Sequence, residues 1–269
     1  MVTMDHDPVR TYGDGLALVT VTRAGRPAVD GLLASLPAAT SRPVHVVVAD
    51  TASASAPAVP SGVEVLRLTE DVGRAAAVNR AVVALDAAIG WVLVADPWVR
   101  WSPGAVDVLL AAAARHPRAG LLGPLLRDRR GLAVPSGGPL PTLLAALRGR
   151  VPTGVPAGPT GWLSTGAALL RRSAWDSVDG LDARYPGARY PGGRADPGDV
   201  DLGDRLGRAG WLVVGVPEAE AAFAVSDAHG ILEPPADGLR RYVQDRAHAP
   251  VRALTALAQR QRKRRGRAR

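Results

Sequence analysis

The sequence predicts an α/β fold, with a Rossmann-like, mostly parallel sheet flanked by helices. Its first hundred residues alternate apolar runs with helical segments, in the order strand, helix, strand, strand, helix, strand. Short connections between such segments are typical of parallel strands joined by right-handed crossover units. An apolar content of 47% in 269 residues is sufficient for a large core in a single domain.

The amino-terminal half contains strands that end on polar residues. Expected strands span residues 16–22, 44–49, 63–68 and 91–95, and expected helices span 28–36 and 73–89. Pro37 is expected to end the first helix, because proline lacks an amide proton and fixes its own φ. Asp50 and Asp96 follow the second and fourth strands. Ligands of open parallel sheets bind at the carboxyl ends of the strands, so both acids are candidate site residues.

The carboxyl-terminal half predicts further elements separated by longer loops. Ser102 and Pro103 begin a helix, as its N-cap and first-turn residue. This helix runs to residue 116, and the other expected elements are a strand at 121–126, a short helix at 140–147, a strand at 161–170, a short helix at 173–178, an acidic helix start at 199–206, a strand at 211–216 and a helix at 239–258 with a break at Pro250. Residues 148–159 and 182–198 are expected to be loops.

The net charge of +8 comes from the carboxyl terminus. Seven of the 33 basic residues lie between Arg260 and Arg269, where no acid occurs, and the other 26 face 25 acidic residues. A solvated, disordered end, a segment that docks on anionic lipid and a nucleic-acid-binding tail are all compatible with such a run. No aromatic residue is interleaved with the arginines, as stacking on bases requires, which argues against nucleic acid.

Composition also indicates the cellular compartment. The chain has no cysteine, which excludes disulfides and thiolate metal sites and fits a reducing cytoplasm. Its apolar runs are too short for a membrane span, and residues 1–15 lack the apolar segment of a secretory signal. We therefore expect a cytoplasmic protein without a membrane crossing.

Known nucleotide and hydrolase motifs are absent. The loop after the first strand contains only Gly25, where a dinucleotide pyrophosphate loop needs three glycines. A Walker loop, a serine nucleophile elbow and a His-Glu metal pair are also missing from the sequence. The Rossmann-like outline therefore does not indicate a dinucleotide oxidoreductase.

A series of short motifs does match one family in order and approximate spacing. The motifs are Val21-Thr22, Asp50, Gly73 with Ala77-Val78-Asn79-Arg80, Trp101-Ser102-Pro103-Gly104, Pro117-Arg118-Ala119-Gly120, Gly161-Trp162-Leu163-Ser164, Arg171-Arg172-Ser173-Ala174 and the run from Asp199 to Gly207. Through them the chain resembles family 2 glycosyltransferases of the GT-A fold over nearly its whole ordered length. Within that family it is most similar to the rhamnosyltransferases that build the linker of actinobacterial arabinogalactan.

The resemblance implies an inverting transfer from a nucleotide-sugar, dTDP-rhamnose, to a hydroxyl of a polyprenyl-diphosphate-linked sugar. Thr22, Asp50, Asp71 and Asp96 are the implied donor-binding residues, with Asp50 accepting from a pyrimidine N–H. A structural interpretation of the two strand-end acids is open as well, because aspartate favours turns through its own backbone hydrogen bonds.

The acceptor side of the implied site comes from the second half of the chain. Asp199 is expected to be the general base that takes a proton from the acceptor hydroxyl, and Trp162 and Asp201 are expected near the acceptor. Asp199 is also compatible with a purely structural role as a helix N-cap. A lipid-linked acceptor would bring the basic tail to anionic lipid at the inner face of the cell membrane.

Implied domain limits follow from the same comparison. We expect a lead at residues 1–15, a GT-A domain at 16–236, a helix at 237–258 and a disordered basic tail at 259–269. Within the domain, residues 16–101 form the nucleotide half and 102–236 the acceptor half.

The implied metal site departs from the family pattern. Mg²⁺ or Mn²⁺ would be held by Asp96 and would neutralise the departing diphosphate, but Trp98 occupies the position of the family's second carboxylate. An indole cannot replace the oxygen donors that Mg²⁺ requires. Two alternatives follow. Either arginines replace the metal, with Arg184, Arg189 and Arg194 as candidates on one loop, or the chain is a catalytically inactive binding or scaffold protein.

Overall fold

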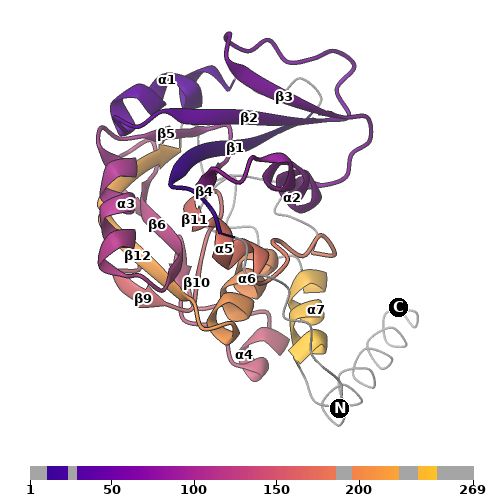
Figure 1. The fold of residues 1–269 in the computed structure, drawn as a ribbon. Helices are drawn as coiled ribbons and strands as arrows, with labels where there is room; N and C mark the ends of the chain where they lie inside the picture. Colours follow the sequence, from indigo (N-terminus) through magenta and orange to yellow (C-terminus); the bar gives the residue numbers. More distant parts are fainter. Residues whose placement is uncertain (1–10, 24–28, 186–195, 224–235, 247–269) are drawn as a thin grey trace, which may run out of the picture.

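A mixed sheet between two layers of helices forms the centre of the molecule (Figure 1). The structure is a computed structural model that describes residues 11–23, 29–185, 196–223 and 236–246. The strands along the sheet are, in spatial order, β3 (Val63–Leu68), β2 (Val44–Thr51), β1 (Gly15–Arg23), β4 (Ile89–Ala95), β11 (Ala167–Arg171), β6 (Ala119–Arg127), β12 (Leu212–Phe223) and β5 (Val99–Trp101).

Four further short strands complete the β structure of the described residues. β7 (Ala133–Val134) pairs with β6 and β9 (Gly158–Thr160) pairs with β12, while β8 (Gly137–Gly138) and β10 (Trp162–Leu163) form a small sheet of their own. In the main sheet β1, β2, β3 and β4 are parallel, as are β6 and β12. β11 is antiparallel to both of its neighbours. The predicted α/β class with a mostly parallel sheet is confirmed.

Helices cover both faces of the sheet and so explain the unbroken apolar runs of its strands. The helices are α1 (Asp30–Ala39), α2 (Arg74–Ala84), α3 (Ala105–Arg115), α4 (Leu143–Leu147), α5 (Arg172–Asp176), α6 (Pro197–Arg208) and α7 (Ala236–Arg246). Leu16 and Leu18 of β1 pack in the cluster formed with α1 and α3, whereas Ala17 and Val19 pack in the cluster with α2, α5 and α6.

Two predicted helix ends were wrong. Pro37 lies inside α1 rather than closing it, because it falls in the last turn, where Thr40 still donates its N–H to the Leu36 carbonyl at 3.2 Å. α2 ends at Ala84, five residues before the predicted end at 89. A turn intervenes there, in which the Asp86 carboxylate accepts the Ala88 N–H at 2.7 Å.

Three other boundaries also differ. Gly104, at φ 72°, is the N-cap of α3, so Ser102 precedes the helix instead of capping it. Residues 161–170 form two strands, β10 and β11, separated by a turn that contains Thr165 and Gly166. The final helix begins at Ala236, before the predicted start at 239, and its predicted continuation beyond Arg246 lies outside the described residues.

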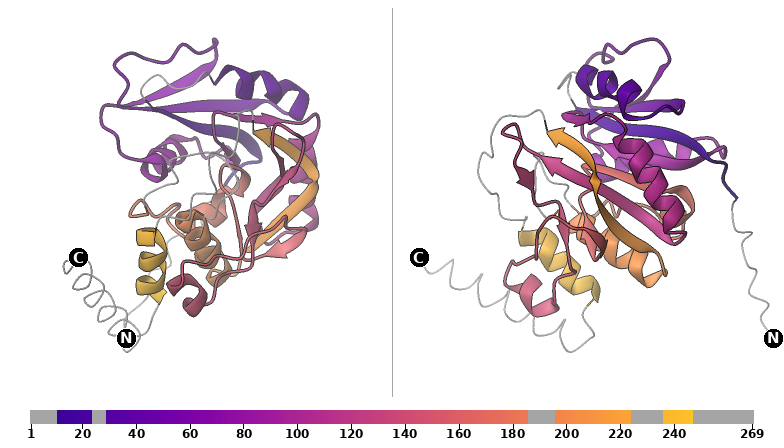
Figure 2. Two further views of the ribbon diagram at one scale, coloured as in Figure 1. Left: turned by 180° about the vertical axis from the view of Figure 1, so that it is seen from behind. Right: turned by 90° about the vertical axis from the view of Figure 1, so that its left-hand side faces the viewer.

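α4, α6 and α7 enclose a small third core at one end of the molecule. Its buried members are Ala146, Trp162, Tyr185, Val200, Tyr242 and Val243. α4 packs beside α7, at the opposite end of the fold from β2 and β3 (Figure 2). Within the described segments, no helix has the length and apolar character required to cross a membrane.

Candidate functional site

Three predicted site residues lie at one edge of the sheet because their strands are parallel neighbours. β1 lies between β2 and β4, and Thr22 is in register with Asp50. The Thr22 hydroxyl donates to Asp50 Oδ1 at 3.2 Å. Asp96 directly follows β4, two strands from Asp50, which corresponds to about 10 Å across the sheet. The edge therefore presents two carboxylates at opposite sides of β1.

Asp50 is fully buried, and its two oxygens differ in their partners. Oδ1 accepts the hydroxyls of Thr22 and Ser53. Oδ2 lies 3.4 Å from Arg67 Nε and accepts no hydrogen bond from the described part of the chain. This buried oxygen therefore has acceptor capacity that no hydrogen bond of the described residues uses.

Asp71 is exposed and belongs to the loop that begins α2. Its Oδ1 accepts the Gly73 N–H at 3.3 Å. Gly73 is the N-cap of α2 at φ 77°, a conformation that glycine adopts without steric cost. This turn places Arg74 at the first position of the helix, pointing toward the strand ends.

Arg74 joins the two halves of the site. Its Nε donates to Asp96 Oδ1 at 3.1 Å, its Nη1 donates to Thr165 Oγ1 at 2.9 Å, and its Nη2 donates to the Thr165 carbonyl at 2.7 Å. Thr165 in turn donates its hydroxyl to Asp199 Oδ1 at 2.6 Å. A continuous chain of hydrogen bonds thus runs from the end of β4 to the first turn of α6.

Asp199 lies inside that first turn and is not the helix cap. The N-cap of α6 is Asp196, whose carboxylate accepts the Gly198 N–H at 2.8 Å. The interpretation of Asp199 as an N-cap is therefore wrong. Its side chain is buried, with 5% of the residue exposed, and it faces Thr165 instead of the helix amides.

Burial has a large effect on the protonation of Asp199. Loss of solvation, followed by the negative charge of Asp196, raises its pKa to about 7, against the opposing effects of Arg74 and Thr165. Burial lowers the pKa of Arg74, but Asp96, Asp199 and Asp196 together outweigh that effect and raise it. Arg74 therefore stays charged, and Asp199 changes protonation near neutral pH, where a general base is most effective.

A narrow pocket opens beside these groups. Its lining residues are Arg74, Ala75, Leu181, Asp182, Tyr185, Asp196, Gly198 and Asp199. Its cavity volume is about 10 Å³, which corresponds to roughly one water molecule. Next to Asp199 there is thus room for a hydroxyl-sized group.

No protein-family model matches the chain. It is 40% identical over 239 residues to N-acetylglucosaminyl-diphospho-decaprenol L-rhamnosyltransferase of Mycobacterium tuberculosis, in two strains, with 77% of this chain and 75% of the relative covered. The chain belongs to this family of glycosyltransferases. The resemblance found in the sequence motifs is confirmed.

Solved structures of similar fold are also glycosyltransferases. One is GalNAc-T7 with UDP, GalNAc and Mn²⁺, with a TM-score of 0.57 and 14% identity, covering 86% of this chain and 48% of that chain. Another is the mannosyltransferase PcManGT of Pyrobaculum calidifontis with GDP-Man and Mn²⁺, with a TM-score of 0.55 and 17% identity, covering 94% of this chain and 82% of that chain. A third is TarS of S. aureus, with a TM-score of 0.54 and 15% identity, covering 85% of this chain and 39% of that chain. The chain spans less than half of GalNAc-T7 and of TarS. At these identities the likeness shows the fold, which confirms the GT-A assignment.

In this glycosyltransferase Trp162 belongs to the core. It is fully buried, and its Nε1–H donates to the Pro152 carbonyl at 3.2 Å. α6 packs directly on it, since a Cβ added at Gly203 would lie 2.3 Å from the Gly161 oxygen and 2.9 Å from Trp162 Cα. Trp162 thus positions the helix that carries Asp199.

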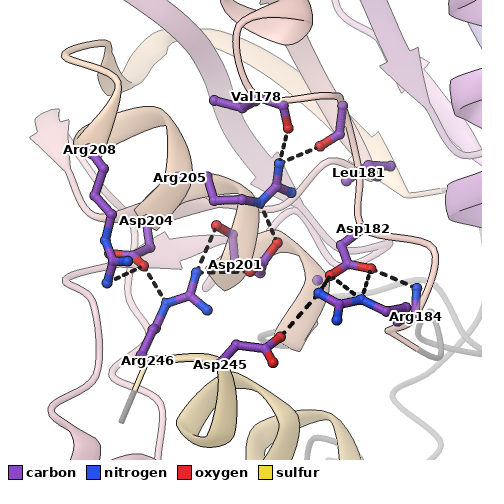
Figure 3. Close-up of polar contacts among 12 residues, drawn as sticks. Val178, Leu181, Asp182, Arg184, Asp201, Asp204, Arg205, Arg208, Asp245 and Arg246 are labelled. Carbon is purple, nitrogen blue, oxygen red and sulfur yellow. Dashed lines mark hydrogen bonds and ion pairs between the residues drawn. The ribbon is translucent and has the colours of Figure 1, made fainter. Parts of the chain in front are cut away.

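Asp201 connects α6 to α7. Its Oδ2 pairs with Arg205 at 2.7 Å, and its Oδ1 pairs with Arg246 of α7 at 2.8 Å (Figure 3). Arg246 also pairs with Asp204, and Arg205 donates to the carbonyl of Gly180 at 2.7 Å. Both oxygens of Asp201 are therefore occupied by arginines in a nearly buried network.

Of the three arginines considered as metal substitutes on the loop before α6, Arg184 is among the described residues. Arg184 is exposed and pairs with Asp182 at 2.6 Å and Asp245 at 3.3 Å (Figure 3). Arg189 and Arg194 lie outside the described residues, as does the basic tail from Arg260 to Arg269.

The residues of the described site do not fit a divalent cation, although two of the similar structures contain Mn²⁺. No group of three or more His, Cys, Asp or Glu residues within the described ranges could hold a metal ion. Asp96 already accepts from Arg74, and the residue two positions on is the half-buried Trp98. Oxygen donors, which Mg²⁺ and Mn²⁺ prefer, are too few here.

Sequence reasoning missed Arg74, Thr165 and Asp196. Arg74 follows the loop glycine Gly73, and Thr165 directly follows the motif that ends at Ser164, so both stand next to recognised motifs. An arginine at the first position of a helix beside strand-end acids is the signal that could have identified the first of them.

Proposed function

We propose that the chain transfers L-rhamnose from a nucleoside-diphosphate donor to an N-acetylglucosaminyl-diphospho-polyprenol, by a single inverting displacement. The mycobacterial relative, whose name describes this activity on decaprenol, supports the choice of substrates. The observation that carries the proposal is the buried Asp199, with a pKa of about 7, hydrogen-bonded to Thr165 beside the Arg74 pocket.

Asp199 is the proposed general base. Its carboxylate takes the proton of the acceptor hydroxyl while the hydroxyl oxygen forms a bond to the anomeric carbon of the donor. The bond from that carbon to the diphosphate oxygen breaks, and the nucleoside diphosphate leaves with the electron pair. Thr165 holds the carboxylate in place by donating to Oδ1, which leaves Oδ2 to accept the proton.

The donor is proposed to lie along the strand ends from β2 to β4. Asp50 Oδ2, which keeps acceptor capacity, would take the N–H of a pyrimidine base such as thymine. Thr22 fixes the rotamer of Asp50, and the exposed Asp71 loop borders the same edge. Asp96 lies two strands farther along the edge, about 10 Å from Asp50, and is proposed to border the ribose and diphosphate.

A lipid-linked acceptor would bring the protein to a membrane surface, and we propose a peripheral location on the inner face. The basic tail from Arg260 to Arg269 is the proposed contact, worth about 1 kcal/mol per basic residue near anionic lipid. In the described part of the chain, α4 exposes Leu144 and Leu147 beside α7, which precedes that tail.

Transfer is tested with dTDP-rhamnose and a polyprenyl-diphosphate-linked N-acetylglucosamine, by following the disaccharide lipid. We expect product with the wild-type chain and a loss of about 10² to 10⁴-fold for Asp199→Asn. Asp86→Asn, at an exposed acid outside the pocket, is the matched control. Failure of the chain to bind any nucleotide would instead favour the scaffold alternative.

Membrane contact is tested separately by flotation with anionic and neutral vesicles. We expect the full chain to float with anionic vesicles and a chain ending at Ala258 to float less, with the difference shrinking in high salt. Equal flotation of the two would remove the tail from the proposal.

A further inference from the structure

The described pocket has more acidic than basic residues in its lining, although the proposed donor is an anion. Among its lining residues, Asp182, Asp196 and Asp199 carry negative charge, and Arg74 is the basic residue. Asp96 adds a further acid next to Arg74. A nucleoside diphosphate brings negative charge and develops more as it departs, so repulsion by these acids must be offset.

We propose that Arg74, in place of a divalent cation, neutralises the diphosphate of the donor. The proposal rests on the proposed function and assigns to one side chain the task that a metal performs in other enzymes of this chemistry. Two observations lead to it. The side chains of the described site do not fit a metal ion, and the departing diphosphate requires a positive charge.

The hydrogen-bond inventory of Arg74 supports this role. A guanidinium has five N–H groups. Three of them are used, one on Asp96 and two on Thr165, so one N–H on Nη1 and one on Nη2 remain. Each of these N–H groups can donate a charge-assisted hydrogen bond to a phosphate oxygen. The side chain is 24% exposed and is therefore accessible from solvent, whereas the pocket beside it has room for about one water molecule.

The same contacts hold the guanidinium rigidly. Asp96 fixes Nε, and the Thr165 carbonyl fixes Nη2, so little reorganisation is needed when a phosphate binds. Asp96 then acts as a positioning residue for Arg74 rather than as a metal ligand. Through Thr165 the guanidinium also reaches Asp199, which links the donor charge to the base.

The test is calorimetric binding of dTDP, dTMP and thymidine to the full chain, with EDTA and with Mg²⁺ or Mn²⁺. We expect the affinity for dTDP to be within about twofold with and without EDTA. Arg74→Gln should weaken dTDP at least tenfold, as loss of a charge-assisted hydrogen bond does, and leave thymidine unchanged. Arg80→Gln, which removes the same charge from an exposed position of α2, should bind all three ligands like wild type.

Arg74→Lys keeps the charge but lacks the planar guanidinium that Asp96 and Thr165 hold, so its affinity for dTDP should lie between those of wild type and Arg74→Gln. This variant distinguishes the effect of lost charge from the effect of a folding defect. Unchanged thymidine affinity in Arg74→Gln shows that the variant is folded; if it fails to fold, Arg74→Lys alone carries the comparison. Binding of dTDP that requires metal, or equal dTDP affinity in Arg74→Lys and wild type, would overturn this inference alone. Failure of the wild-type chain to bind any of the nucleotides or dTDP-rhamnose would overturn the proposed function, and with it the inference.

Discussion

Asp199→Asn should make the protein more stable at neutral pH while removing its activity. The substitution keeps the shape of the side chain and an oxygen that accepts from Thr165, but it removes the charge. In the wild type, burial raises the pKa of Asp199 from 3.8 to about 7. The folded state therefore holds a proton that the unfolded state, with a pKa near 3.9, releases.

The sign and size of the effect follow from proton linkage. Between about pH 4 and pH 7 the folded state binds more protons at this site, so the free energy of unfolding falls as pH rises. The loss begins near the unfolded pKa and is complete above the folded pKa of about 7. A difference of about three pKa units corresponds to about 4 kcal/mol as an upper limit. The Asp199→Asn variant does not titrate at this position, so at pH 8 its free energy of unfolding should exceed that of wild type by up to this amount.

Urea unfolding at pH 5, 6, 7 and 8 measures the difference. We expect the advantage of the variant to be smallest at pH 5, about 1.4 kcal/mol for the one pKa unit that separates pH 5 from the unfolded pKa, and to widen toward pH 8. Asp237→Asn, at a side chain that is 86% exposed, is the control and should show no such divergence. If the stability of wild type and of Asp199→Asn changed in parallel with pH, Asp199 would not be a buried carboxylate with a raised pKa. Transfer by the variant at the wild-type rate would refute its role as base.

Three further predictions concern the surroundings of Asp199. Thr165→Val removes a hydrogen bond that lowers the pKa of Asp199, so the rising limb of the kcat/KM profile near pH 7 should move to higher pH; an unmoved limb contradicts the assignment. Arg246→Ala leaves the buried Asp201 and Asp204 without their shared partner and should lower the free energy of unfolding by about 3–5 kcal/mol, as measured by thermal or urea unfolding. Arg240→Ala, on the exposed side of α7, is the control and should lower it by less than about 1 kcal/mol. Gly203→Ala should destabilise the protein by about 1–3 kcal/mol, because the added Cβ would contact the Gly161 carbonyl. Gly207 lies on the same helix with open space around it, so Gly207→Ala should stabilise the protein by up to about 1 kcal/mol. Equal effects of the two substitutions would contradict the close packing of α6.

Sequence periodicity was sufficient to predict the strands whose carboxyl ends carry Asp50 and Asp96. Apolar runs ending on Asp50 and Asp96 placed both acids at the carboxyl ends of parallel strands, because burial on both faces leaves few other structures for such runs. Limits of helices were less predictable. Pro37 and Ala84 show that a single proline, or a turn stabilised by Asp86, alters a helix end without changing the apolar pattern.

The connection between the two halves of the site could not be predicted from sequence. Arg74 and Thr165 are 91 residues apart, and Thr165 and Asp199 are 34 apart. No local propensity encodes such contacts, since they depend on how β11 packs against β4 in the finished sheet. The role of Trp162 was obscured for a similar reason, because only the packing of α6 shows that its ring is fully buried.

α6 couples the proposed base to the carboxyl-terminal helix. Asp199 and Asp201 are two residues apart, about 200° around the helix, so they face opposite directions. One faces Thr165 in the pocket, and the other is held by Arg246 of α7 (Figure 3). Without Arg246, Asp201 would keep Arg205 and Asp204 would keep Arg208, so α6 itself supplies part of the charge that its buried aspartates need.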